Sequence, residues 1–313
     1  MIFFDILLFL VGCILLGTSG HLMVKTLKKL TGYYKLKEFV VSFILVSILT
    51  SFPELFVGIF SALSHVPKLS VGDVIGANIV DLTLVVGIAA LLGKRIKIKS
   101  EIERKDIFYT SGIAILPLIL TLDHFLSETD AIILLFIFLL NLMILYGERK
   151  QFKKEVTDKI RKREVLKDSL IFIIGLFILL VSSEIIVQTA TKLVVDLNLA
   201  PLLIGLTLVS IGTTLPELSF EVNSVLRGHS GMALGDLLGS VVTNSTLVLG
   251  VTALLSNGIE FYSHSFFEGI VTMILVLGMF NIFSKTEYEI TWKEGLILLG
   301  IYIVFIITSL LIR

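Results

Sequence analysis

The sequence has little cysteine and little charge. Its one cysteine, Cys13, excludes a disulfide within the chain and leaves the compartment open. Charged residues make up 17% of the 313 positions, against about 25% in ordinary soluble domains. The formal net charge is zero and says nothing about nucleic-acid or acidic partners, and no nucleic-acid partner is predicted. This composition is not that of an ordinary soluble chain.

Hydrophobic residues, in contrast, make up 55% of the chain, and the mean hydropathy is +0.98. Runs of roughly 17–25 apolar residues recur along the sequence, which is typical of membrane-spanning helices. The first run lacks a basic segment before it, so no cleavable signal is predicted. The predicted fold class is an all-α polytopic membrane protein. Ten spans are expected, at about 2–24, 38–64, 70–93, 106–122, 129–147, 168–191, 200–226, 233–256, 263–284 and 292–311.

The segments between these spans differ in their Lys and Arg content according to the side on which they would lie. One side receives 23 of these residues, most of them in 25–37, 94–105 and 149–167, and the other side receives three. Basic residues favour the cytoplasmic side. We therefore expect a multi-pass protein of the cell membrane with both termini outside and the basic loop 148–167 in the cytoplasm.

The chain contains an internal repeat at a fixed offset of 163 residues. Residues 46–92 and 209–255 align without a gap and share 19 identities in 47 positions. Five spans separate equivalent positions, so the two copies cross the membrane in opposite directions, as in secondary transporters with inverted repeats. The predicted organisation is a first five-helix repeat in 1–147, the loop 148–167, and a second repeat in 168–313.

Each copy of the repeat carries a polar stripe inside an apolar span. Four residues with the spacing i, i+3, i+4 and i+7 share one helix face in each copy. The two stripes are Ser47, Thr50, Ser51, Glu54 and Ser210, Thr213, Thr214, Glu217. A proline, Pro53 or Pro216, precedes each glutamate, so we expect an interrupted helix that leaves carbonyl oxygens such as those of Thr50 and Thr213 open.

These groups are hard oxygen ligands, and an acid at membrane depth costs a few kcal/mol unless it is compensated. No His or Cys accompanies them and no basic residue lies in the central spans. This excludes the usual zinc, copper and iron sites. Calcium accepts such ligands, as does sodium, which is of similar size, so a bound cation is the expected counter-charge for Glu54 and Glu217.

The third and eighth spans add further polar residues. Asp81 and Asn244 lie deep enough in these spans to meet the two glutamates, and Ser240 lies one turn before Asn244. Asp73 and Asp236 are expected at the starts of their helices, either as caps that the helix dipole favours or as part of an aqueous vestibule. The glycines around them are expected to let helices pack closely.

With these motifs in place, the chain resembles the cation/calcium exchanger superfamily, on its sodium/calcium exchanger side. The resemblance covers nearly the whole chain and rests on Pro53-Glu54 and on Gly212–Glu217, which is similar to the family pattern Gly-Thr-Ser-x-Pro-Glu. It implies that Glu54 and Glu217 are the central calcium ligands, helped by the carbonyls of Thr50 and Thr213. The remaining implied site residues are Ser51, Thr214 and Ser240 for flanking sodium ions, and Asp81 and Asn244 for the central ring.

Three features depart from the family pattern. Leu49 stands where the family usually has glycine, and Ala77 stands where a hydroxyl is common. Aspartate replaces the commoner asparagine at positions 73 and 236. The cage is therefore expected to be asymmetric, with a hydroxyl at Ser240 that its first-half counterpart lacks.

The predicted function is antiport of Ca²⁺ for Na⁺ at one shared carboxylate site, without a cofactor and without enzymatic activity. The family resemblance also implies that the first and sixth spans slide across the core to alternate access. No protein partner is predicted, and a monomer in the lipid bilayer suffices for this mechanism. A Ca²⁺/H⁺ antiporter remains open, as does a potassium-dependent exchanger that uses Asp81. Remote alternatives are an intramembrane aspartyl protease built on Asp73 and Asp236 and a passive channel.

Overall fold

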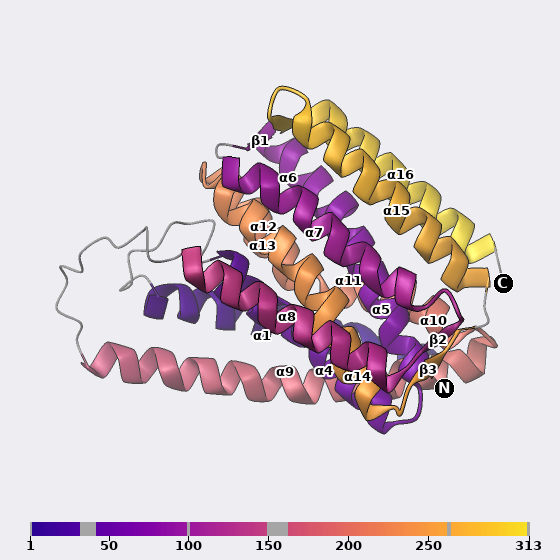
Figure 1. Ribbon diagram of the computed structural model, residues 1–313. Helices are drawn as coiled ribbons and strands as arrows, with labels where there is room; N and C mark the ends of the chain where they lie inside the picture. Colours follow the sequence, from indigo (N-terminus) through magenta and orange to yellow (C-terminus); the bar gives the residue numbers. More distant parts are fainter. Residues whose placement is uncertain (1, 32–41, 99–100, 149–161, 262–263, 312–313) are drawn as a thin grey trace.

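The computed structural model describes residues 2–31, 42–98, 101–148, 162–261 and 264–311, and its helices form two similar series (Figure 1). The first series is α1 (Ile2–Thr31), η1 (Ser42–Val46), α3 (Ser47–Thr50), α4 (Phe52–Leu63), α5 (Pro67–Val80), η2 (Asp81–Val85), α6 (Val86–Gly93), α7 (Glu101–Leu120) and α8 (Glu128–Glu148). The second series is α9 (Lys162–Leu197), α10 (Pro201–Ile204), η4 (Gly205–Val209), α11 (Ser210–Thr213), α12 (Leu215–Leu226), α13 (Ser230–Thr243), η5 (Asn244–Val248), α14 (Leu249–Leu255), α15 (His264–Lys285) and α16 (Trp292–Leu311). Most of the predicted loop 148–167 lies outside the described residues.

The two series obey the offset of 163 residues found in the sequence. The helices α4, α5 and η2 begin and end at the positions equivalent to those of α12, α13 and η5. The packing is also repeated, because α4 contacts α5 and α14 while α12 contacts α13 and α6. Each of these two helices therefore packs between one helix of its own half and one helix of the other half, in a pseudo-twofold arrangement.

Each half contains one interrupted helix, as the prolines predicted. The helix that ends at Thr50 is followed by Ser51 in a non-helical conformation, and α4 then begins with Pro53 in its first turn. Pro53 has no N–H to lose at that position, so it starts a helix without cost. The second half repeats the arrangement at Thr214, where the chain bends by 46°.

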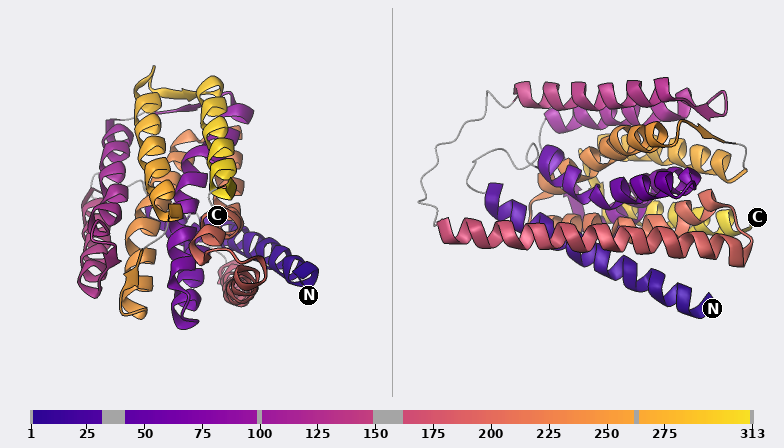
Figure 2. Two further views of the ribbon diagram at one scale, coloured as in Figure 1. Left: turned by 90° about the vertical axis from the view of Figure 1, so that its right-hand side faces the viewer. Right: turned by 90° about the horizontal axis from the view of Figure 1, so that it is seen from below.

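Six helices in the described residues are long and apolar enough to cross a membrane, and a seventh is counted if the bent pair around Thr214 is one span. Two of the six, 67–93 and 230–255, are the most enclosed, with 83% of their apolar window buried. The long helices α1 and α9 contact each other on one side of the molecule (Figure 2). The count of ten spans stays a prediction.

Two short antiparallel strand pairs, which the sequence did not predict, close the ends of the molecule. The strand β1 (Arg95–Lys97) pairs with β4 (Glu289–Thr291), and β2 (Phe125–Leu126) pairs with β3 (Ile259–Glu260). Each pair joins one loop from each half. The predicted alternation puts both loops of a pair on the same side of the membrane, so the pairing agrees with the order of the spans.

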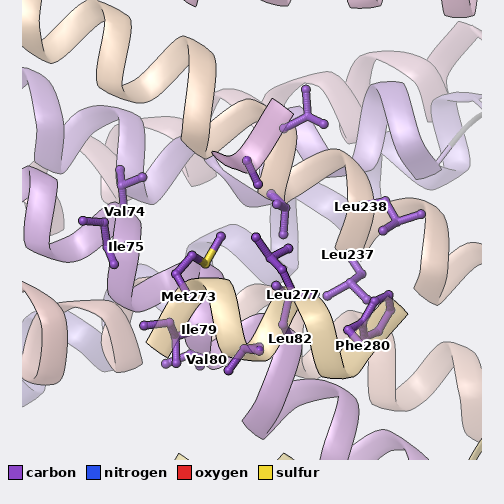
Figure 3. Packing of buried hydrophobic residues seen from close by; sticks show 14 of the residues in the cluster. Val74, Ile75, Ile79, Val80, Leu82, Leu237, Leu238, Met273, Leu277 and Phe280 are labelled. Carbon is purple, nitrogen blue, oxygen red and sulfur yellow. The ribbon is translucent and has the colours of Figure 1, made fainter. Parts of the chain in front are cut away.

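The apolar core packs around α5 and α13, the helices that lie against the two interruptions. Met273, Leu277 and Phe280 of α15 pack among Ile79, Leu82 and neighbouring side chains of α5 and η2, and toward α13 (Figure 3). All of these side chains are nearly or fully buried. This layer encloses α5 and α13, on which the polar residues of the repeat lie.

Candidate cation-binding site

Glu54 and Glu217 lie in the first turn of α4 and α12, directly after the two interruptions. Both side chains are 0% exposed, and none of their four carboxylate oxygens has a hydrogen-bond partner. In the described part of the chain, no basic side chain forms an ion pair with either of them. Two buried carboxylates without partners are costly in a membrane protein, which is the feature expected of a cation site.

Asp81 and Asn244 occupy equivalent positions at the start of the π-helical turns η2 and η5, and both are fully buried. The Nδ2 group of Asn244 donates to Asn78 Oδ1 at 3.3 Å, and Asn78 Nδ2 donates to Ser245 Oγ at 2.9 Å. Neither Asn244 Oδ1 nor either carboxylate oxygen of Asp81 has a hydrogen-bond partner. Asn78, which sequence reasoning did not single out, therefore positions the Asn244 amide so that its oxygen stays available.

Asp73 and Asp236 are not helix caps, and that expectation was wrong. Each is the seventh residue of its helix, because α5 begins at Pro67 and α13 at Ser230. Both are fully buried where the interrupted helix of the other half crosses. Thr213 Oγ1 donates to Asp73 Oδ1 at 2.9 Å and Thr50 Oγ1 donates to Asp236 Oδ1 at 3.1 Å. Each half therefore supplies a hydroxyl to a carboxylate of the other.

The remaining predicted hydroxyls divide into two groups. Ser240 Oγ lies 3.1 Å from Thr50 Oγ1, and Ser51 Oγ is buried without a partner. The hydroxyls of Ser47, Ser210 and Thr214 donate to carbonyls of their own helices, those of Phe43, Leu206 and Ser210 respectively. Ser47 and Ser210 also press against Gly239 and Gly76 of the opposite half. These contacts give Ser47 and Ser210 a structural role whether or not they bind an ion.

Sequence reasoning missed one carboxylate, Glu221, which lies one turn after Glu217 and is 1% exposed. The signal was in the repeat alignment, because Glu221 is matched by Gly58 in the first half. The buried carboxylates of the core are Glu54, Asp73, Asp81, Glu217, Glu221 and Asp236. Within the described residues, no three His, Cys, Asp or Glu side chains form a ready-made metal site.

A cavity of about 290 Å³ opens beside α12. Its lining includes His21, Lys25, Ser219, Asn223, Ser224 and Arg227. Ser219 Oγ lies 3.0 Å from His21 Nδ1, which links α12 to α1. Ser224 follows Glu221 by three residues, so the cavity opens about one helical turn from Glu221.

The sequence of the chain matches the model of a known family. The family described as sodium/calcium exchanger protein matches residues 4–147 and 168–311, which is nearly the whole chain. The chain belongs to the sodium/calcium exchanger family. The inner membrane protein YrbG of Escherichia coli is 28% identical to this exchanger over 80% of each chain. The sodium/calcium exchanger MaX1 of Methanosarcina acetivorans is 25% identical over 98% of this chain and 99% of its own.

Solved structures agree with the family assignment. The sodium-calcium exchanger NCX_Mj, in a structure soaked with Na⁺, superposes with a TM-score of 0.73 and 26% identity, over 98% of this exchanger and 99% of that chain. The predicted superfamily and fold class are thereby confirmed. The chain is a multi-pass membrane transporter and not an enzyme, so the protease alternative is excluded.

Proposed function

We propose that this exchanger moves Ca²⁺ against Na⁺ by alternating access, with both ions using one carboxylate site. The observation that carries the proposal is the pair Glu54 and Glu217, which are fully buried with four unpartnered oxygens. The two residues come from equivalent helix interruptions of inverted halves, which is where secondary transporters bind their substrates. A bound cation offsets the cost of keeping both carboxylates charged.

The other ligands follow from the oxygens that remain free around this pair. Ca²⁺ takes six to eight oxygens, more than two glutamates supply. Asp81 and Asn244 would complete the central ring, because their Oδ atoms are buried without partners. The backbone carbonyls of Thr50 and Thr213 would add ligands at the interruptions. Flanking Na⁺ ions would bind near Ser51, Thr214 and Ser240, and Ser47 and Ser210 would lie next to these binding sites.

Exchange would follow from mutual exclusion at this site. One Ca²⁺, or several Na⁺, neutralises the carboxylates and permits the switch between inward and outward states, whereas the empty site is too charged to reorient easily. The paired helices α1 and α9 would move across the core during the switch. No cofactor and no partner chain is needed for this cycle.

The decisive variants are Glu54→Gln and Glu217→Gln, which keep the side-chain volume and remove one charge each. We expect each to abolish Ca²⁺ uptake into proteoliposomes driven by a Na⁺ gradient, because one partner of the central pair is lost. Glu268→Gln is the matched control, since Glu268 on α15 is also a carboxylate with unpartnered oxygens but lies outside the site. Unchanged uptake in Glu54→Gln would contradict the proposal.

A second candidate, favoured by the third carboxylate at Asp81, is a K⁺-dependent Na⁺/Ca²⁺ exchanger or a Ca²⁺/H⁺ antiporter. The same vesicles separate the alternatives when uptake is driven by a Na⁺ gradient with K⁺, by a Na⁺ gradient without K⁺, or by a pH gradient alone. We expect uptake with Na⁺ in the absence of K⁺. Uptake that needs K⁺, or that a pH gradient alone sustains, would assign the coupling to the second candidate.

A further inference from the structure

Glu221 breaks the symmetry between the two halves of the exchanger. It lies on α12 one helical turn after Glu217 and is 1% exposed, and its Oε1 atom has no hydrogen-bond partner. The equivalent residue on α4 is Gly58. At this position the second half therefore carries a buried carboxyl group that the first half lacks, and the transport site described above does not use it.

The surroundings of Gly58 show why no carboxylate fits in the first half. A Cβ atom at Gly58 would lie 2.5 Å from Thr252 Oγ1 and 3.1 Å from Ser70 Oγ. These two hydroxyls are themselves hydrogen-bonded at 3.1 Å. The hydroxyl pair fills the space that a longer side chain would need.

The positions equivalent to Ser70 and Thr252 differ in the second half in a matching way. They are Ala233 and Ala89, both buried. The helices α13 and α6, which carry these alanines, pack against α12 as α5 and α14 pack against α4. Relative to the first half, three residues thus differ together: two hydroxyl side chains are replaced by alanines and one glycine by glutamate. The smaller alanines make room for the Glu221 side chain and offer it no hydroxyl partner.

Asp236 lies on the part of α13 that faces Glu221. Gly58 faces Ser70 in the first half, Ala233 is the residue equivalent to Ser70, and Asp236 follows Ala233 by three residues on the same helix. The helix α13 contacts α12, which carries Glu221. Asp236 Oδ1 accepts the Thr50 hydroxyl, whereas Asp236 Oδ2 is buried without a partner. In the described part of the chain, no basic side chain forms an ion pair with either carboxylate.

We propose that Glu221 and Asp236 form an additional binding subsite for one monovalent alkali cation, present only in the second half. It deepens the proposed function, because the subsite adjoins the shared Ca²⁺/Na⁺ site and adds a cation to its Na⁺-loaded state. One added carboxylate calls for one added positive charge, and carboxylate oxygens are the ligands that hard cations prefer. Ser224, which follows Glu221 by three residues, lines the cavity beside α12, so this cavity opens about one helical turn from the subsite.

The test is the number of Na⁺ ions bound at equilibrium by the purified exchanger without Ca²⁺, measured with ²²Na⁺. We expect Glu221→Gln to bind one Na⁺ fewer than the wild-type protein, while ⁴⁵Ca²⁺ binding in Na⁺-free buffer stays within about twofold. Glu268→Gln, a matched carboxylate on α15, should keep the wild-type number. An unchanged number of Na⁺ ions in Glu221→Gln overturns the proposal and leaves Glu221 as a carboxyl that binds no alkali cation.

A second variant keeps the test valid if Glu221→Gln does not fold. The triple variant Glu221→Gly/Ala233→Ser/Ala89→Thr copies the first-half packing, with its hydroxyl pair, into the second half. We expect it to fold and to bind one Na⁺ fewer, and wild-type Na⁺ binding by this variant also overturns the proposal. This test is independent of the test of the proposed function. Retained Ca²⁺ exchange in Glu54→Gln would contradict the proposed function, whereas an unchanged number of bound Na⁺ ions in Glu221→Gln would contradict the subsite.

Discussion

At the scale of single residues, the polar core is built from reciprocal contacts between the halves. Thr50 binds Asp236 and Thr213 binds Asp73, so each interrupted helix is tied to the helix that crosses it from the other half. A hydrogen bond to a charged group contributes about 1.5–3 kcal/mol. The two bonds therefore fix each interruption relative to the helix that crosses it, and the glutamate oxygens remain free for a cation.

The hydroxyl contacts of the two halves differ at Ala77, and a substitution at this position can be tested. Thr50 contacts Ser240, whereas the equivalent partner of Thr213 is Ala77, which has no hydroxyl. We expect Ala77→Ser to supply the missing oxygen and to lower the Na⁺ concentration that half-saturates exchange by about two- to tenfold. That range corresponds to one hydrogen bond of about 0.5–1.5 kcal/mol.

The reverse change is the control for this variant. Ser240→Ala removes the hydroxyl that the second half retains and should raise the half-saturating Na⁺ concentration by a similar factor. Na⁺-dependent Ca²⁺ efflux from vesicles measures both. Equal Na⁺ dependence in Ala77→Ser and the wild-type protein would show that position 77 does not contribute to Na⁺ binding.

The sequence was informative about which residues are buried and less so about their partners. Glu54, Glu217, Asp81 and Asn244 were predicted to lie together in the core because their polar types recur at one offset inside apolar spans. Asp73 was misplaced because a helix start is set by the loop before it, and Pro67 begins α5 earlier than the apolar run indicated. The link from Thr213 to Asp73 crosses 140 positions of chain, which no local pattern reports.

At the scale of helices, α1 packs closely against the interruption of the second half. Gly17 and Gly20 of α1 face Leu215 and Pro216, and a Cβ atom at either glycine would overlap these side chains. Cys13 packs on Gly212 in the same way. Because these α1 positions carry small side chains, no bulky group projects from this face of α1 toward the interruption. A sliding motion of α1 across the site would require such a face.

A cross-link between Cys13 and position 212 tests that motion. A Cβ atom at Gly212 would lie 3.3 Å from Cys13 Cβ, close to the separation of about 3.5–4.5 Å found in disulfides. We expect Gly212→Cys to form a disulfide with Cys13 under mild oxidation and to stop Ca²⁺ exchange, because α1 is then fixed to α11. Reduction should restore the rate measured before oxidation.

The control is Cys13→Ala/Gly212→Cys, which carries the new thiol without its partner. Oxidant should leave the exchange rate of this variant unchanged. If the disulfide forms, as judged by mass spectrometry, and exchange continues at the same rate, α1 does not move relative to α11 during transport.

Helix interruptions and apolar runs could be predicted from sequence, whereas their local geometry could not. Pro53 and Pro216 predict an interruption of the helix, because proline lacks the backbone N–H that a helix hydrogen bond needs. The π-helical turns η2 and η5 carry no such residue, and they begin at Asp81 and Asn244. Tertiary packing sets that geometry, as it sets the strand pairs at the ends of the molecule.

At the scale of the whole molecule, the inverted arrangement makes a prediction about sidedness. Ser64 and Arg227 are equivalent, exposed residues that follow α4 and α12. In a Cys13→Ala background, we expect a membrane-impermeant maleimide to label Ser64→Cys in intact cells and Arg227→Cys only after permeabilisation. The reason is that equivalent positions of inverted repeats face opposite sides, and Lys and Arg place the second of these in the cytoplasm.

Cys13→Ala alone, without an introduced thiol, sets the background of this labelling. Labelling of both introduced cysteines from the same side would exclude the inverted orientation. Labelling of Arg227→Cys alone in intact cells would keep the inversion and reverse the predicted position of both termini.

The reciprocal bonds between Thr50 and Asp236 and between Thr213 and Asp73 bear on how such a chain can arise. Because each bond joins a residue of one half to the equivalent partner in the other, two identical five-helix subunits inserted in opposite orientations would make both bonds without being covalently joined. A charge placed on one side only, as at Glu221 opposite Gly58, is not open to such a pair, since any substitution would appear twice. Joining the halves into one polypeptide therefore allows the side chains on the two sides of the site to diverge.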